Sequence, residues 1–183
     1  MLQTQAPDPV PPPRATSRPI VLIGLMGVGK TTVGRRLAQR LHLPFVDADA
    51  EIETAAGMTV AEIFERFGEP HFRDGERRVI ARLIDGVPKV IATGGGAFLN
   101  ADTRALILDQ SIAVWLDAAP EVLAERVSKR DHRPLLRGKD PLKVLSELAA
   151  VRNPVYALAP VHVISKVAPH DATVNAILEA LNL

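Results

Sequence analysis

Residues 24–31 read Gly-Leu-Met-Gly-Val-Gly-Lys-Thr, and this stretch constrains the fold more than any other part of the chain. It fits the pattern of Gly, four residues, Gly, Lys and Ser or Thr that forms phosphate-binding loops. The apolar run at 20–23 is typical of a buried strand, and Val33, Leu37 and Leu41 after the loop have helical spacing. Strand, glycine loop and helix in this order are the context in which the pattern indicates a binding site.

Each part of this loop has a role in binding a nucleoside triphosphate. The glycines let backbone N–H groups surround phosphate oxygens, and the start of the following helix adds a favourable dipole. We expect Lys30 to reach the β- and γ-phosphates and the Thr31 hydroxyl to ligate a magnesium ion. A glycine-rich turn without a ligand is the alternative. The complete motif in its full context favours the nucleotide site.

Composition and charge limit the class of protein further. The 183 residues suit one compact domain, and a formal net charge of +1 gives no reason to expect nucleic acid or a membrane as partner. The absence of cysteine excludes disulfides and thiolate metal sites. The sequence shows neither an apolar run of membrane length nor the apolar core of a signal peptide. We therefore expect a cytoplasmic protein, and a monomer because no exposed apolar stripe demands a partner.

Strand-like and helix-like patterns alternate from about Ile20 onwards, so we expect a single domain over 20–183. Residues 1–19 carry six prolines and few large apolar side chains, and are expected to form a Pro-rich disordered tail. The alternation predicts an α/β fold with helices on both faces of a parallel sheet. The five strand patterns begin near 20, 45, 90, 112 and 161.

Two carboxylates follow the second strand pattern, at the sheet edge where ligands of open α/β folds bind. One explanation is that the only role of Asp49 is to cap the helix that follows. A phosphate-loop enzyme needs an acidic residue near its magnesium, however, and the strand at 90–93 runs into glycines without one. We therefore expect Asp47 to assist the metal and Asp49 to face a substrate.

Two later features have both a structural and a functional explanation. Arg73 and Glu76 lie one turn apart on a helical pattern that follows a capping box at 59–62 and a break at Gly68. They could form a surface ion pair of little energetic weight, or Arg73 could bind an anionic substrate, and spacing alone does not decide. Likewise, the glycines at 94–96 could form a tight turn or let a small molecule approach bare backbone.

The segment 126–139 carries six basic side chains and a single acidic one, together with Pro134 and Gly138. A charge run is often only a solvated face. The mixture of rigid and flexible residues better suits a mobile lid, at about 128–140, that closes over the triphosphate. Such a lid would exclude water and place cations on the transferring phosphoryl group.

Together these residues resemble the shikimate kinase family from about Ile20 to the C-terminus. The resemblance rests on six segments, namely Gly24–Thr32, Asp47-Ala-Asp49, Phe72-Arg73 with Glu76, Gly94–Gly96, Arg133-Pro-Leu-Leu136, and Arg152 with Tyr156. It implies a P-loop, three-layer αβα fold similar to nucleoside monophosphate kinases, with a five-stranded parallel sheet in the order 2-3-1-4-5. It also implies ATP- and Mg²⁺-dependent phosphorylation of the 3-hydroxyl of shikimate, a step towards chorismate and the aromatic amino acids.

The resemblance further implies a role for each matching residue, with substrate-binding helices at about 49–85. Asp49 would orient or deprotonate the attacking hydroxyl, while Arg73 and Arg152 would clamp the shikimate carboxylate. Glu76 would hold Arg73, Thr31 would ligate magnesium, and Asp47 would assist through water. The turn of Gly94, Gly95 and Gly96 would complete the acceptor pocket. The ATP contacts implied are Gly27, Val28, Gly29, Lys30, Thr31, Thr32, Arg126 near the adenine and Arg133 in the lid. Lys30 and Arg133 would act in catalysis together with Asp49.

Two alternatives stay open. Another small-molecule kinase of the same fold, such as a gluconate or nucleotide kinase, would share the loop but is not expected to combine all these motifs. A catalytically silent nucleotide-binding partner would be expected to lack a catalytic group, yet Lys30, Asp47, Asp49 and Arg133 are present. The loop at 166–170 lacks the extra basic residues of many family members, which leaves the adenine contacts open.

Overall fold

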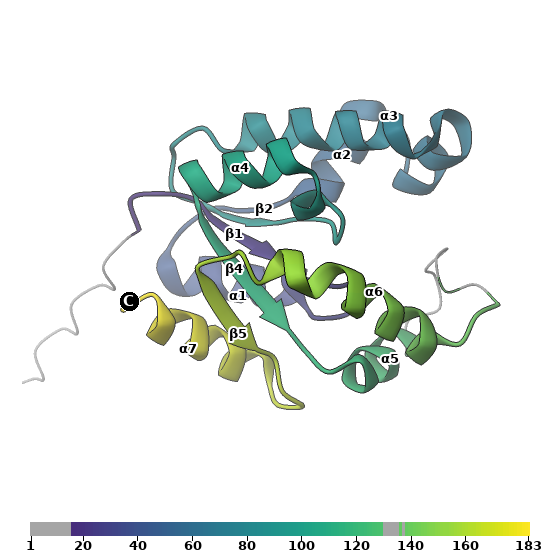
Figure 1. Ribbon diagram of the computed structural model, residues 1–183. Helices are drawn as coiled ribbons and strands as arrows, with labels where there is room; N and C mark the ends of the chain where they lie inside the picture. The colour runs from purple at the N-terminus through teal and green to yellow at the C-terminus, as the bar shows by residue number, and fades with distance from the viewer. Residues whose placement is uncertain (1–15, 130–135, 137) are drawn as a thin grey trace, which may run out of the picture.

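The computed structural model describes residues 16–129, 136 and 138–183. Within these residues, five parallel strands form one sheet in the order β2-β3-β1-β4-β5 (Figure 1). This order confirms the predicted α/β fold. The strands are β1 (Ile20–Ile23), β2 (Phe45–Asp47), β3 (Val90–Ala92), β4 (Ile112–Asp117) and β5 (Val161–Ile164).

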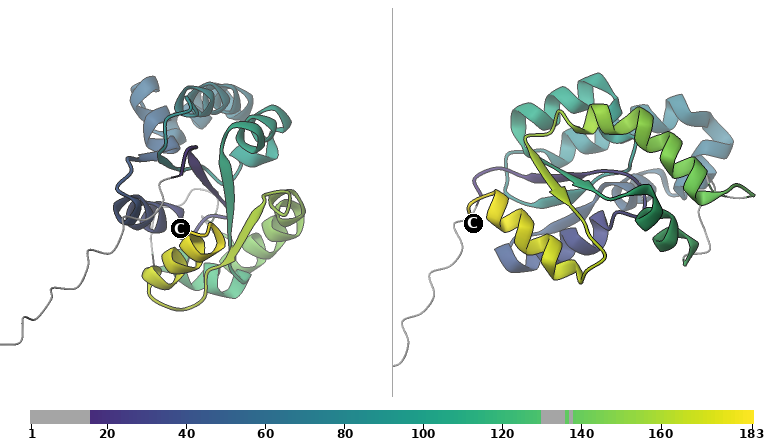
Figure 2. Two further views of the ribbon diagram at one scale, coloured as in Figure 1. Left: turned by 90° about the vertical axis from the view of Figure 1, so that its left-hand side faces the viewer. Right: turned by 60° about the horizontal axis from the view of Figure 1, so that its bottom comes forward.

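Helices cover both faces of the sheet, with α1 and α7 on one side and α4 and α6 on the other (Figure 2). A pair of packed helices, α2 and α3, adjoins the β2 edge. The helices are α1 (Lys30–Leu41), α2 (Ala48–Ala56), α3 (Val60–Leu83), α4 (Ala101–Gln110), α5 (Pro120–Ser128), α6 (Pro141–Tyr156) and α7 (His170–Ala180), with a 3₁₀ turn η1 (Ala97–Leu99) after β3. Among the described helices, none has the combination of length and apolar character that a membrane span requires.

The central strands form a rigid platform for whatever lies beyond their carboxyl ends. Every residue of β1 and β3 is buried, as expected for strands covered on both faces. In register, Val21 of β1 lies between Ile91 of β3 and Ala113 of β4. The edge strand β5 instead buries only Val163. Because β2, β3 and β1 are neighbouring parallel strands, the loops that follow them emerge at the same edge of the sheet.

The helix ends agree with the sequence patterns in most places. Thr59 and Glu62 form the predicted capping box at the start of α3. Gly68, with φ 78° and ψ 174°, breaks α3 into two helical segments as predicted. Pro154 by itself favours a kink or the end of a helix, and it lies in the last turn of α6, which ends at Tyr156. A proline so near the end removes a hydrogen bond only from the last turn.

The start of the packed region differs slightly from the expected boundary at Ile20. Residues 1–15 of the predicted tail lie outside the described residues. Thr16 and Pro19 are buried, and the Pro19 carbonyl accepts a hydrogen bond of 2.8 Å from the Ile112 amide. Thr16 and Pro19 therefore belong to the packed structure, and Pro19 continues the ladder towards β4, whereas Ser17 and Arg18 are exposed.

Two helical glycines provide a matched test of the packing between α1 and the sheet. A Cβ at Gly34 would lie 2.6 Å from the Phe45 ring and 3.2 Å from Leu22, whereas a Cβ at Gly75 would meet nothing within 4 Å. Alanine favours a helix by about 1 kcal/mol over glycine, but overpacking costs about 1–3 kcal/mol. We predict that Gly75→Ala raises Tm by about 2–4 °C and that Gly34→Ala lowers it, as measured by calorimetry. An equal rise in both variants would contradict the close packing at Gly34.

Candidate active site

The shape of the phosphate loop depends on glycines at positions whose backbone conformation other residues rarely adopt. Gly24, Gly27 and Gly29 all have positive φ, of 141°, 82° and 98°. A Cβ at Gly24 would lie 2.3 Å from the Leu116 carbonyl oxygen, and one at Gly27 would lie 2.8 Å from Val127. The loop is thus packed tightly against the end of β4 and against α5.

Lys30 lies across the mouth of this loop. Its Nζ donates hydrogen bonds of 2.7 Å to the Gly24 carbonyl and 3.0 Å to the Leu25 carbonyl. Gly29 is the N-cap of α1 and makes no side-chain cap, so the first amides of the helix point into the loop. Amides, helix dipole and ammonium together form an anion site of the size and charge of a phosphate group.

Asp47 and Thr31 meet at the edge of the loop. The Thr31 hydroxyl donates to Asp47 Oδ2 at 2.9 Å. Asp47 Oδ1 accepts from the amides of Asp49 and Ala50, at 3.0 and 3.4 Å, and so caps α2. The capping role considered for Asp49 therefore belongs to Asp47, because Asp47 is the residue with extended backbone before the helix. Asp49 lies in the first turn, where its side chain is free to face the pocket.

Asp49 is half-buried, and one of its carboxylate oxygens has no hydrogen-bond partner in the described part of the chain. Its Oδ1 is buried and accepts no hydrogen bond from the described residues. Burial raises the pKa of Asp49 above its ordinary value, and the nearby Asp47 charge adds to this, while Lys30 and Arg73 oppose it. A carboxylate that is poorly solvated and unpaired is suited to accept a hydrogen bond or a proton from a hydroxyl group.

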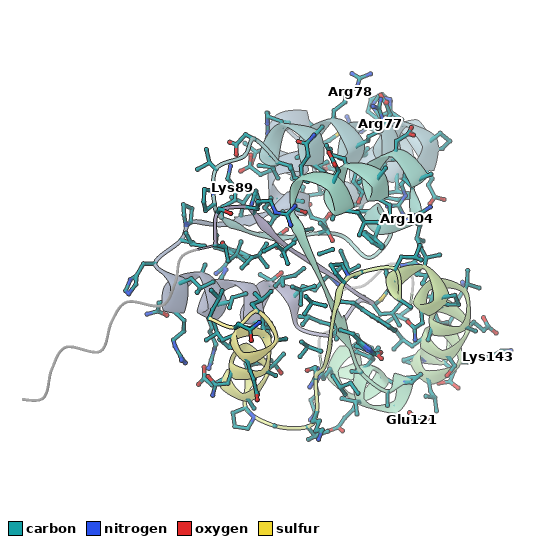
Figure 3. The ribbon with its side chains drawn as sticks, turned by 60° about the vertical axis from the view of Figure 1, so that its left-hand side comes forward. Arg77, Arg78, Lys89, Arg104, Glu121 and Lys143 are labelled. Atoms are coloured by element: carbon teal, nitrogen blue, oxygen red, sulfur yellow. The ribbon has the colours of Figure 1, made fainter. Side chains whose placement is uncertain are left out.

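The pair of Arg73 and Glu76 is not a surface ion pair. Arg73 Nη1 donates to Glu76 Oε2 at 2.7 Å, and only 3% of the Glu76 side chain is exposed. Burial raises the pKa of Glu76, against the lowering effect of Arg73. By contrast, Arg77 and Arg78 point outward from α3 and pair with the half-exposed Asp74 (Figure 3). Of the two explanations considered from spacing, a binding role for Arg73 is therefore favoured over an ion pair on the surface.

The glycine turn after β3 makes room for four charged side chains. A Cβ at Gly94 would lie 2.9 Å from Asp49 Oδ1 and 3.1 Å from Glu76 Oε1. One at Gly95 would lie 3.0 Å from Arg152 Nη1, and one at Gly96 would lie 2.4 Å from both Nη atoms of Arg73. We call this group of residues, Gly94–Gly96 with Asp49, Arg73, Glu76 and Arg152, the acceptor cluster. It brings together side chains from α2, α3 and α6.

Arg126 of α5 connects the phosphate loop to the loop before α7. Its guanidinium donates to the Val28 carbonyl and the Ser165 hydroxyl, both at 3.3 Å, and to the Lys166 carbonyl at 3.0 Å. His170, the first residue of α7, lies on the other side with its ring against Gly29. Sequence reasoning missed His170, because its place beside the loop depends on how α7 packs against α1.

A cavity of about 340 Å³ joins the phosphate loop to the acceptor cluster. Its lining includes most of the predicted site residues, namely Gly27, Gly29, Lys30, Thr31, Thr32, Asp47, Asp49, Gly94, Gly95 and Arg126. Arg152 instead lines a second cavity of about 750 Å³, whose lining also includes Lys139 and Lys143. Of the other predicted residues, Val28, Arg73 and Gly96 do not line the first cavity, and Arg133 lies outside the described residues. The first cavity thus runs from the anion site at Lys30 to the carboxylate of Asp49.

Comparison with known proteins agrees with this geometry. The family model for shikimate kinase matches residues 26–182. Shikimate kinase of Caulobacter vibrioides (strain NA1000 / CB15N) is 62% identical over 174 residues, which cover 95% of this chain and 86% of that protein. Shikimate kinase of Novosphingobium aromaticivorans is 56% identical over 173 residues, which cover 92% of this chain and 90% of that protein.

Solved structures lead to the same conclusion. The shikimate kinase of Acinetobacter baumannii in complex with shikimate has a TM-score of 0.85 and 36% identity, and the match covers 91% of this chain and 94% of that one. A gluconokinase from Sinorhizobium meliloti has a TM-score of 0.61 at 21% identity, covering 92% of this chain and 94% of that one, which shows a shared fold alone. The chain belongs to the shikimate kinase family.

Proposed function

We propose that this chain transfers the γ-phosphoryl group of ATP to the 3-hydroxyl of shikimate, giving shikimate 3-phosphate and ADP. The observation that carries the proposal is the acceptor cluster, in which a carboxylate with a buried, unpaired oxygen and two arginines converge on one turn beside the phosphate loop. An acceptor with hydroxyls and a carboxylate needs both kinds of group. The related A. baumannii protein has been solved with shikimate bound.

The acceptor is held and oriented by side chains of opposite charge. Arg73 and Arg152 receive the carboxylate, since a planar guanidinium matches a carboxylate with paired hydrogen bonds. Glu76 keeps Arg73 in place through the 2.7 Å contact. Asp49 accepts a hydrogen bond from the reacting hydroxyl through its unpaired oxygen and takes the proton as the new P–O bond forms.

The donor is held by the loop and its neighbours. The amides of the loop and Lys30 would bind the phosphates. Arg126, which donates to the Val28 and Lys166 carbonyls, would contact the adenine beside the loop before α7. Phosphoryl transfer needs positioning and neutralisation of charge more than covalent chemistry. Arg133 remains our candidate for the lid cation on the transferring group. We further propose that the protein is a monomer in the cytoplasm and that ATP and shikimate are its small-molecule partners.

The residues at the loop also suit a magnesium ion bound with ATP. The Thr31 hydroxyl and the Asp47 carboxylate lie 2.9 Å apart at the edge of the cavity, and both are the hard oxygen donors that Mg²⁺ prefers. Within the described residues, no three His, Asp or Glu side chains gather into a separate metal site. When bound, the ion would neutralise charge on the β- and γ-phosphates, with Thr31 as ligand and Asp47 acting through water.

The test of this function is a comparison of acceptors. ADP release is measured with ATP and Mg²⁺ in the presence of shikimate, gluconate or a nucleoside monophosphate. We predict release with shikimate alone, because the acceptor cluster combines a carboxylate with two arginines and the chain belongs to the shikimate kinase family. Release with another acceptor instead would overturn the acceptor assignment and retain the nucleotide site. ATP binding without any release would favour a silent nucleotide-binding protein.

Asp49→Asn tests the role of the unpaired carboxylate. The variant keeps the shape of the side chain but cannot take a proton, so we predict that kcat falls by about 100-fold or more. Steady-state kinetics with both substrates saturating measures this. Turnover close to that of the wild type would remove Asp49 from the chemical step.

The same variant has an expected effect on stability. Because burial raises the pKa of Asp49, its contribution to stability is full below the ordinary aspartate pKa of about 3.9 and is lost as the pH rises through the raised value. Asp49→Asn should therefore have a higher Tm than the wild type at neutral pH without Mg²⁺, and the difference should vanish in acid. A lower Tm at neutral pH would show that Asp49 is stabilised as a charge.

A further inference from the structure

Tyr156 connects α6 to the acceptor cluster. It follows Arg152 by four residues, so both side chains leave the same face of α6. The Tyr156 side chain is fully buried, and its ring centroid lies 6.1 Å from that of Trp115 on β4. Its hydroxyl donates a hydrogen bond to the Gly95 carbonyl. A buried side chain from a distant element thus ends on the backbone of the glycine turn.

The Gly95 carbonyl has no other anchor in the described structure. The Gly94 and Gly96 carbonyls on either side are held by the amides of Ala97 and Leu99, at 3.3 and 3.1 Å. Three consecutive glycines leave a backbone with unusual conformational freedom. The middle carbonyl is the one that the turn does not hold by itself. The Tyr156 hydroxyl therefore supplies the missing constraint.

Fixing this carbonyl also fixes the donor on the other side of the peptide. In a planar trans peptide the Gly95 carbonyl and the Gly96 N–H point in opposite directions. Since the carbonyl points to the Tyr156 hydroxyl, the Gly96 N–H points away from it. The orientation of this one peptide decides whether the turn can offer a donor to a bound acceptor.

The Tyr156 hydroxyl also lies beside Arg152. A Cβ at Gly95 would be 3.0 Å from Arg152 Nη1 and 3.7 Å from the Tyr156 hydroxyl oxygen, so the two groups flank the same point. Burial raises the pKa of the Tyr156 hydroxyl, although the Arg152 charge opposes this, so the group stays protonated and donates. With its hydrogen directed at Gly95, the hydroxyl oxygen presents lone pairs towards the guanidinium side.

We propose that Tyr156 is a positioning residue for the acceptor, which orients the peptide between Gly95 and Gly96 and the Arg152 guanidinium before shikimate binds. This inference rests on the proposed function of the acceptor cluster. Tyr156 itself lies below the turn and is not expected to touch either substrate. Its effect should therefore appear in the binding of the acceptor and leave the binding of ATP unchanged.

Tyr156→Phe removes one hydroxyl and keeps the buried ring. Because the Gly95 carbonyl loses its partner and Arg152 its neighbour, we predict that the shikimate Kd and KM rise about 10-fold. The Kd of ATP should stay within twofold of the wild type, and kcat at saturating shikimate should change less than KM. Isothermal titration calorimetry with each substrate, together with steady-state kinetics, measures this division.

Ser111→Ala is the matched control. The Ser111 hydroxyl is also buried and donates to a backbone carbonyl, that of Ile107, at 2.6 Å, but it precedes β4 at the opposite end of the sheet from the site. Both variants lose one buried hydrogen bond and should lose similar stability. We predict that only Tyr156→Phe changes shikimate binding. Equal shikimate affinity in both variants and the wild type would overturn the positioning role.

A double-mutant cycle tests whether Tyr156 acts through Arg152. Arg152→Lys weakens paired contacts to a carboxylate, and we predict that it weakens shikimate binding less in the Tyr156→Phe background than in the wild type. Independent, multiplying effects would overturn the link between the two residues. The outcome is separable from that of the proposed function. A wild-type protein that fails to bind shikimate would overturn the function itself, whereas normal binding by both wild type and Tyr156→Phe would overturn this inference alone.

Discussion

The structure depends on a turn of three residues without side chains, into which four charged groups converge. Asp49, Arg73, Glu76 and Arg152 approach Gly94–Gly96 so closely that a Cβ at any of the three positions would press on one of them. Buried charges are tolerated when they are paired, and Arg73 and Glu76 meet this condition at 2.7 Å. The exceptions are one oxygen of Asp49 and one of Glu76, which accept no hydrogen bond from the described residues. Unpaired oxygens at such a point are most simply explained by a ligand that completes them.

The order of the strands places that turn beside the phosphate loop. β3 lies between β1 and β2, so the glycine turn leaves the sheet next to both the loop after β1 and the carboxylates after β2. Thr93 closes the arrangement, because its hydroxyl donates to the Leu22 carbonyl at 2.9 Å and ties the ends of β3 and β1 together. The two arginines come from helices on different sides of the turn. A phosphate site and an acceptor site are thereby held at one edge by rigid elements.

Local patterns predicted the parts of this arrangement that are contiguous in sequence. The phosphate loop, the capping box at Thr59 and the break at Gly68 each depend on a few neighbouring residues, and the structure contains them where expected. The strand order came from resemblance, since no local pattern specifies which strands pair. The function of the glycine turn was only half visible. It could be predicted as a place of close approach, but not that the protein's own Asp49, Arg73 and Arg152 are what approach it.

Features that depend on tertiary packing could not be predicted locally. The hydrogen bond from Tyr156 to Gly95 joins residues 61 positions apart, and Arg126 reaches Val28 across 98 positions. Whether Asp47 or Asp49 caps α2 depends on where the helix begins, and a shift of two residues decides it. At Pro154, a local signal for a kink or a helix end lies two residues before the last residue of α6.

The most direct test of this account is the affinity of Gly96→Ala for shikimate. Gly96 has φ −95° and ψ −12°, which alanine adopts readily, so the substitution adds a methyl group without backbone strain. That methyl group would lie about 2.4 Å from the Arg73 guanidinium and must displace it. We predict that the Kd of shikimate, measured by isothermal titration calorimetry, rises at least about 10-fold while the Kd of ATP is unchanged. Unchanged shikimate affinity, in a variant that folds as the wild type does, would contradict the claim that the glycine turn exists to admit these side chains.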